Sequence, residues 1–133
     1  MTGETNLQTL LASMSPRLDD TAWVFATVDE EEAGPFIVPA IASFREAEGL
    51  TLVLPQPTTN DLKNMSAPMS RITLEVHSSL EAVGLTAAVA GALAKEGISS
   101  NVIAAYYHDH IFVPKASADR ALAILQALTT STD

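Results

Sequence analysis

Apolar and polar residues follow clear helix and strand periodicities in the second half of the chain. Residues 70–77 alternate between the two types, which is typical of a strand with one buried face and one solvated face. Leu85, Val89 and Leu93 recur at helical spacing, and Gly97 is a natural helix terminator. The predicted elements of this half are strands at 70–77, 100–107 and 110–114 and helices at 84–97 and 117–128.

The first half carries weaker signals. Its predicted elements are helices at 6–14 and 58–65 and strands at 21–29, 35–44 and 50–55. Pro16 ends the first helix, and the strand at 21–29 is apolar on both faces, which indicates that it is covered on both sides. Pro39 lies inside the predicted strand at 35–44 and therefore indicates an edge strand or a bulge.

The order of elements from residue 70 onward is strand, helix, strand, strand, helix. One further strand would complete a split βαβ, ferredoxin-like unit, and too few residues follow the last helix to supply it. The missing strand must then come from the N-terminal half. The sequence therefore predicts an α+β fold of two interleaved ferredoxin-like βαββαβ units, an N-terminal unit at 1–68 and a C-terminal unit at 69–133.

Composition sets broad limits on the class of protein. The chain has 133 residues, of which 47% are hydrophobic and 17% charged, which suits one domain or two very small ones sharing a core. No apolar run is long enough for a membrane helix, and the first residues lack the basic and apolar segments of a signal peptide. The chain has no cysteine. We therefore expect a cytoplasmic protein with no membrane partner.

Net charge argues against two classes of partner. Sixteen acidic and seven basic residues give a formal charge of −9, which repels nucleic acid and anionic membrane surfaces. The basic residues are scattered along the chain. Four consecutive acidic residues, Asp29 to Glu32, are expected to form a solvated loop.

A His-Asp-His sequence at 108–110 raises the question of metal binding. Zinc sites need three or four ligands, and the only other histidine is His77, so a site built from His77, His108, Asp109 and His110 is an alternative. The preferred interpretation is the polar tip of a hairpin, with His108 and Asp109 as a two-residue turn. No nucleophile elbow, phosphate loop or dinucleotide fingerprint occurs, so we predict no catalytic residues and no cofactor.

The stretch from 83 to 113 resembles the ACT-domain family of small ferredoxin-like regulatory modules. The resemblance is carried by three motifs: Gly84-Leu85 opening a helix, Gly97-Ile98-Ser99 closing it, and Tyr106-x-x-Asp109-x-Ile111-x-Val113 in a hairpin. It is greatest for the subclass found in aspartokinase regulatory regions and in the cytosolic arginine sensor of animals. The N-terminal half is similar to the companion half of small stand-alone proteins built from two such units. The resemblance implies amino-acid binding and a regulatory outcome.

The turn at 77–84 is the candidate ligand site. A glycine at the start of a helix exposes backbone amides, and the helix dipole favours a carboxylate there. Ser78 and Ser79 could donate hydroxyl hydrogen bonds, and Glu81 could accept from a ligand ammonium. The resemblance to ACT domains implies that residues of the neighbouring predicted strand at 100–107 also contact the ligand. The full predicted set is His77, Ser78, Ser79, Glu81, Val83, Gly84, Leu85, Asn101, Val102 and Ile103.

Other interpretations stay open. Ser78 and Ser79 can also be an ordinary turn with a helix cap, and Gly84 can merely ease packing. The expected function is a non-catalytic regulatory protein, a homodimer, that binds an amino acid or similar small zwitterion. The alternatives are a ligand-free dimerisation or docking module for a metabolic enzyme and a histidine-based metal-dependent enzyme.

Overall fold

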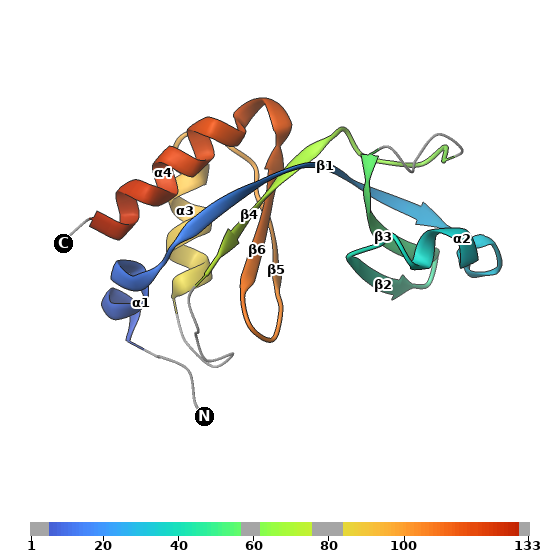
Figure 1. The fold of residues 1–133 in the computed structure, drawn as a ribbon, viewed down its shortest axis with the longest axis horizontal. Coiled ribbons are helices and arrows are strands. Elements are labelled where there is room, and N and C mark those ends of the chain that lie inside the picture. The colour runs from blue at the N-terminus through green and yellow to red at the C-terminus, as the bar shows by residue number, and fades with distance from the viewer. Residues whose placement is uncertain (1–5, 57–61, 76–83, 131–133) are drawn as a thin grey trace. The chain divides into compact units, whose positions relative to one another are not determined.

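The computed structural model describes residues 6–56, 62–75 and 84–130 and divides into two compact units (Figure 1). The first unit contains residues 1–20 and 70–133, and the second contains residues 21–69. The long strand β1 (Pro16–Val28) belongs to both, because its first residues lie in the first unit and the remainder in the second. The first unit therefore combines the two ends of the chain.

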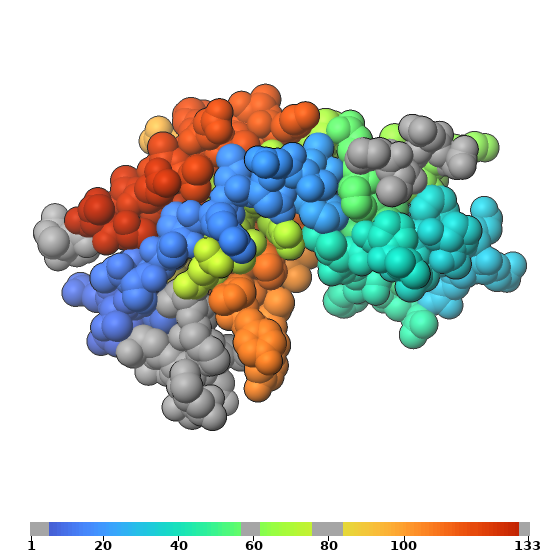
Figure 2. All heavy atoms as spheres, in the orientation of Figure 1, coloured from blue at the N-terminus to red at the C-terminus, as the bar shows by residue number. Residues whose placement is uncertain are grey.

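Within the described residues, three helices and four strands build the first unit. The helices are α1 (Leu7–Ser13), α3 (Leu85–Lys95) and α4 (Ala118–Thr130). The strands follow the order β1, β4 (Met69–Leu74), β6 (Asp109–Pro114) and β5 (Asn101–Ala104), and a 3₁₀ turn, η3 (Lys115–Ser117), precedes α4. One apolar cluster contains residues of all three helices and of β4 and β6, so the helices share one face of this sheet. Helices α1 and α4 lie side by side (Figure 2).

Alternation along the strands separates the two faces of this sheet. Ile72 and Leu74 of β4 lie in the apolar cluster, so Arg71 and Thr73 face the other side. There the Arg71 Nε donates to Asp19 Oδ2 over 2.8 Å, and Thr73 Oγ1 lies 3.0 Å from His110 Nδ1. The face without helices therefore carries polar pairs, as the alternation at 70–77 predicted.

The second unit is smaller. Its strands follow the order β1, β3 (Gly49–Pro55) and β2 (Ala42–Glu46), all antiparallel, and its helical elements are η1 (Glu30–Glu32) and α2 (Gly34–Ile37). Val24, Ala26, Leu52 and Leu54 form its core, against which Phe36 of α2 packs. Strand β2 is the outermost strand of this unit.

Most predicted elements are confirmed, with four corrections. The strand predicted at 21–29 begins five residues earlier, at Pro16. The predicted strand at 35–44 is wrong in its first part, because Gly34 and Pro35 open the short helix α2 and the strand begins only at Ala42. The strand predicted to reach Tyr107 ends at Ala104. Part of the predicted helix at 58–65 lies outside the described residues, and 62–65 are not helical. The α+β, ferredoxin-like class is confirmed, because helices and strands are interspersed along the chain and the helices of the first unit share one face of its sheet.

Among the described residues, every helix is too short or too polar for a transmembrane span.

Candidate functional site

The candidate site lies where α3 begins. Gly84 occupies the N-cap position with φ +99°, a left-handed conformation that glycine adopts without a Cβ penalty. Its carbonyl accepts from the Ala88 amide over 2.8 Å, which is the first hydrogen bond of the helix. Because glycine has no side chain, Gly84 does not cap the amides of the first turn itself. The conformation of Gly84 agrees with the turn that the sequence predicts, and its role in ligand binding stays a prediction.

Leu7 occupies one side of this turn. A Cβ added to Gly84 would lie 3.2 Å from Cδ2 of Leu7, which is a tight contact. Leu85, the next residue, is 3% exposed and belongs to the apolar cluster. Packing against α1 therefore constrains this glycine, as one of the two sequence interpretations of Gly84 predicted.

Replacing Gly84 by alanine is expected to lower the free energy of unfolding by about 1–3 kcal/mol. The alanine side chain would be strained at the positive φ of this position, and its Cβ would be crowded by Leu7. Gly91 is the matched control, since it lies within α3 with no heavy atom within 4 Å of an added Cβ. Gly91→Ala should raise stability by roughly 0.5–1 kcal/mol. Urea denaturation of both variants measures the difference, and equal effects would contradict this account of the turn.

The other predicted site residues lie partly outside the described residues and partly beyond the far end of α3. Five of them lie outside the described residues: His77, Ser78, Ser79, Glu81 and Val83. Asn101 begins β5 after the far end of α3, and a helix of eleven residues is about 16 Å long. One small ligand on a single copy therefore does not contact both Gly84 and Asn101.

The three strand residues also point to different faces of the sheet. Val102 packs against the apolar cluster beneath the helices, opposite Ile111 of β6. Asn101 and Ile103 alternate with it and so face the other side, where Asn101 is exposed. The structure does not bring these three side chains together around one point.

The hairpin between β5 and β6 has a different tip from the predicted one. The loop is residues 105–108, closed by the Ala105 amide donating to the His108 carbonyl over 3.0 Å. Asp109 pairs with Ala104 inside the strands, so the two-residue His108-Asp109 turn is wrong. The exposed tip residues are instead Tyr106 and Tyr107, whose rings meet edge to face with centroids 5.0 Å apart.

Sequence reasoning placed Asp109 in a turn, whereas the structure places it at the start of β6. Asp109 alternates with Ile111 and Val113, both in the apolar cluster, and therefore lies on the helix-covered face of β6. Burial raises the pKa of the Asp109 carboxyl, and the charge of His108 lowers it by a smaller amount. The period-two pattern from 109 to 113 is the sequence signal that would have placed this carboxyl inward.

Asp109 and Gly84 lie at the same end of the first unit. Strand β5 runs back from the far end of α3 toward the hairpin tip, and β6 begins at Asp109 directly after that tip (Figure 1). The first turn of α3 and a half-buried carboxyl therefore share one end of the helix-covered face. A helix N-terminus attracts an anionic group, and a carboxylate attracts a cationic one.

The histidines do not assemble into a metal site within the described part of the chain, where no group of three His, Asp or Glu side chains could hold an ion. His110 Nδ1 contacts Thr73 Oγ1, and burial together with the charge of Arg71 lowers the pKa of His110. His108 Nδ1 is buried without a hydrogen-bond partner. His77 lies outside the described residues.

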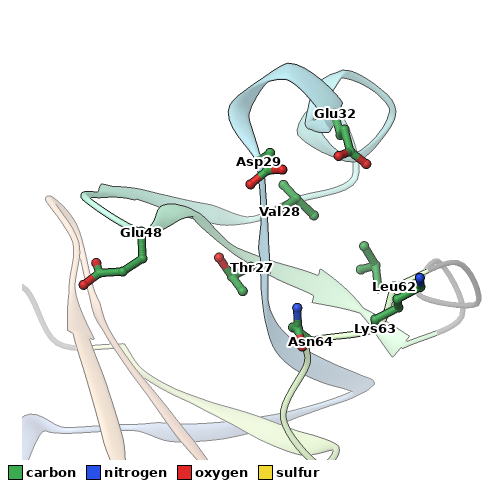
Figure 3. A pocket seen from close by; sticks show the side chains of 8 residues that line it. All are labelled: Thr27, Val28, Asp29, Glu32, Glu48, Leu62, Lys63 and Asn64. Atoms are coloured by element: carbon green, nitrogen blue, oxygen red, sulfur yellow. The ribbon is translucent and has the colours of Figure 1, made fainter.

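The second unit has a hollow of its own, of about 350 Å³, beside the acidic run (Figure 3). Carboxylates reach it from the end of β1, from η1 and from the turn before β3, and Lys63 lies across from them. Glu30, Glu31 and Glu32 are all exposed, as predicted, although they form the 3₁₀ turn η1 rather than an irregular loop.

Solved structures resemble this fold over most of its length. A Vibrio cholerae protein of unknown function, described as a possible transport protein, is 52% identical with a TM-score of 0.84, over 93% of this chain and 96% of that one. An Agrobacterium tumefaciens protein is 16% identical with a TM-score of 0.73, over 87% and 89%. The ligand-free regulatory subunit of aspartate kinase from Thermus thermophilus is 9% identical with a TM-score of 0.64, over 88% and 97%.

Family models match both halves of the chain. One ACT-domain model matches residues 2–67 and a second ACT-domain model matches residues 67–127. No curated protein shows a significant sequence match. The two models together cover nearly all of the sequence, and the chain therefore belongs to the ACT-domain family.

Proposed function

We propose that this chain is a non-catalytic, cytoplasmic regulatory protein that reversibly binds an amino acid or a similar small zwitterion. ACT domains are regulatory modules, and two of them account for nearly the whole sequence. We place the ligand at the end of the first unit where α3 begins. The observation that carries this placement is the Asp109 carboxyl, which is half-buried on the face that also holds the first turn of α3.

A zwitterion complements the two charges of this end of the unit. The ligand carboxylate would accept hydrogen bonds from the first amides of α3, where the helix dipole adds attraction. The ligand ammonium would pair with Asp109, for which no hydrogen bond or salt bridge to a described side chain is present. Burial has a larger effect on the pKa of this carboxyl than the positive charge of His108, so binding a further cation there would relieve part of the cost of desolvation.

The proposed site keeps part of the predicted set and changes the rest. Gly84 and Leu85 contribute backbone amides, and Ser78, Ser79 and Glu81 stay predictions for contacts from the preceding turn. Asn101, at the far end of α3, is not part of the site on one copy. Asp109 takes the role of ammonium acceptor that the sequence assigned to Glu81.

Regulation requires two states with different affinities for the ligand. We propose that the states are arrangements of a homodimer, because small symmetric oligomers are the commonest assemblies of soluble proteins. The rival candidate is a docking module that dimerises without a ligand.

A thermal-shift panel of the twenty amino acids separates these candidates. A ligand that binds only the folded state raises the melting temperature by mass action, by an amount that grows with its concentration. We expect at least one amino acid to do so. A protein that is dimeric yet shows no shift with any amino acid would favour the docking module and contradict ligand binding.

A further inference from the structure

Helix α1 contacts the glycine at which α3 begins. A Cβ built on Gly84 would meet the side chain of Leu7, with Cδ2, Cδ1 and Cγ at 3.2, 3.7 and 3.9 Å. Among the described residues these are the three nearest heavy atoms, apart from those of the chain neighbours of Gly84. Gly84 is therefore packed closely against the first turn of α1, and close-packed contacts of this kind transmit displacement from one partner to the other.

Helix α1 is held at both ends, although it has only seven residues. Leu10 is fully buried and Met14, the C-cap residue, is 3% exposed, and both belong to the apolar cluster of the first unit. At the other end Asn6 Oδ1 accepts from the Thr9 amide over 3.0 Å, which caps the first turn. Because such a short helix is unstable on its own, these contacts define its position, and a displacement at Leu7 moves it as one body.

Strand β1 follows α1 almost immediately (Figure 1). Only Ser15 separates the C-cap residue of α1 from Pro16, the first residue of the strand. The Ser15 carbonyl accepts from the Glu75 amide over 3.2 Å, and Arg17 Nη2 lies 3.2 Å from Glu75 Oε2. The end of α1 and the start of β1 therefore share the same fixed point beside β4.

The same strand continues into the second unit. Strand β1 is unbroken from Pro16 to Val28, and the division between the two units falls between Asp20 and Thr21. Trp23 lies just beyond this division, is 6% exposed and is the only tryptophan of the chain. Regular, hydrogen-bonded structure thus leads from the contact at Gly84 to a natural fluorescent reporter in the second unit.

We infer that α1 couples the proposed ligand site to the second unit, with Leu7 as the residue that positions Gly84. The inference rests on the proposed function, because it takes the amides after Gly84 to receive the ligand carboxylate. A bound carboxylate fixes the first turn of α3, and the contact with Leu7 passes this constraint to α1 and β1. Coupling between sites is reciprocal and typically changes affinity by about 5- to 150-fold. Since Leu7 provides one partly buried contact, the expected effect is at the low end, about five- to tenfold.

A double-mutant cycle on the ligand-free protein tests the contact between Leu7 and Gly84. Gly84→Ala crowds Leu7, so it should change the fluorescence spectrum of Trp23. Adding Leu7→Ala should remove most of that change, because it makes room for the new methyl group. Gly91→Ala is the matched control, with no heavy atom within 4 Å of the added Cβ, and should leave the spectrum unchanged.

Two results of this cycle would overturn the inference: a Trp23 spectrum that Gly84→Ala leaves unchanged, or strictly additive effects of Gly84→Ala and Leu7→Ala. Circular dichroism checks that each variant folds. Leu7→Phe enlarges the other partner of the same contact, should change the spectrum in the same way, and carries the test if Gly84→Ala does not fold.

Titration with the amino acid found in the thermal-shift panel tests the coupling to the ligand. In the wild type the amino acid should change the fluorescence of Trp23. Leu7→Ala should bind it about five- to tenfold more weakly by calorimetry and lose most of the Trp23 response, and Leu7→Met should restore both. Leu11→Ala is the matched control and should keep both, because Leu11 is also a partly buried leucine of α1 and its truncation removes the same atoms.

The titration separates failure of this inference from failure of the proposed function. An amino acid that binds the wild type and Leu7→Ala equally, with the same Trp23 response, would overturn the inference and leave the proposed function standing. If no amino acid raises the melting temperature of the wild type, the proposed function fails and the coupling to a ligand fails with it.

Discussion

Replacing Asp109 by asparagine is expected to weaken amino-acid binding at least about 30-fold and, at neutral pH, to stabilise the ligand-free protein. The binding loss follows because the asparagine amide has no negative charge to pair with an ammonium group, and removing one charge of a desolvated pair costs about 2 kcal/mol or more. Titration calorimetry with the amino acid identified by the thermal-shift panel measures this loss.

The stabilisation follows from the raised pKa of the Asp109 carboxyl. The folded protein binds a proton at this group more tightly than the unfolded chain does, so the free energy of unfolding falls as the pH rises from the unfolded pKa through the folded pKa. At neutral pH the wild type therefore carries the full cost of ionising a half-buried carboxyl, and the asparagine variant does not. The difference between wild type and Asp109→Asn should shrink as the pH is lowered.

Asp20→Asn is the matched control, because Asp20 is an exposed aspartate of the same unit. It should leave both affinity and stability nearly unchanged. An Asp109→Asn protein that binds its amino acid as tightly as the wild type would remove Asp109 from the site. A variant less stable than the wild type at neutral pH would show that the carboxylate has a structural partner.

Leu10→Ala should give the largest loss of stability of the substitutions considered. Leu10 is fully buried in the apolar cluster that also contains Leu93 and Leu125, and its truncation leaves a cavity among three helices. Comparable leucine truncations cost about 2–5 kcal/mol. Urea unfolding at equilibrium measures the effect, with the exposed Gln8→Ala in the same helix as control.

The Leu10 experiment also tests how the ends of the chain combine. Helix α1 falls within residues 2–67, which one ACT-domain model matches, yet it packs into the unit that contains residues 70–133. If Leu10→Ala and Gln8→Ala had equally small effects, α1 would not be part of that core. The domain boundary between residues 68 and 69 stays a prediction, and exchange of N-terminal elements across it is what we propose.

Periodicity alone predicted the elements whose core contacts repeat over several turns. Helix α3 was placed correctly because Leu85, Val89 and Leu93 keep helical spacing and are all buried. The segment at 35–44 was misassigned because a four-residue helix has too few turns to show a period. In this segment the Gly-Pro pair correctly indicates a helix start, but the prediction followed the run of apolar residues, which favours a strand.

At the candidate site, the sequence predicts backbone conformation better than it predicts which side chains lie close together. The conformation of Gly84 was predictable because a glycine before a helix has a specific conformational use, while its part in ligand binding stays a prediction. Asp109 was placed in a turn because an aspartate beside histidines in a hairpin resembles a turn residue, and the register decides whether it lies in the loop or in the strand. The separation of Asn101 from Gly84 could not be predicted, because the path of the chain after α3 is a property of the assembled unit.

We propose that the first turn of α3 receives the carboxylate of an amino acid. Nuclear magnetic resonance titration of the ¹⁵N-labelled chain with the amino acid found in the thermal-shift panel is the most direct test of this contact. We expect the amides of Leu85, Thr86 and Ala87 to shift most, together with that of Asp109. Shifts confined to the hollow beside Asp29 and Glu48 in the second unit, or no shifts at saturating ligand, would contradict it.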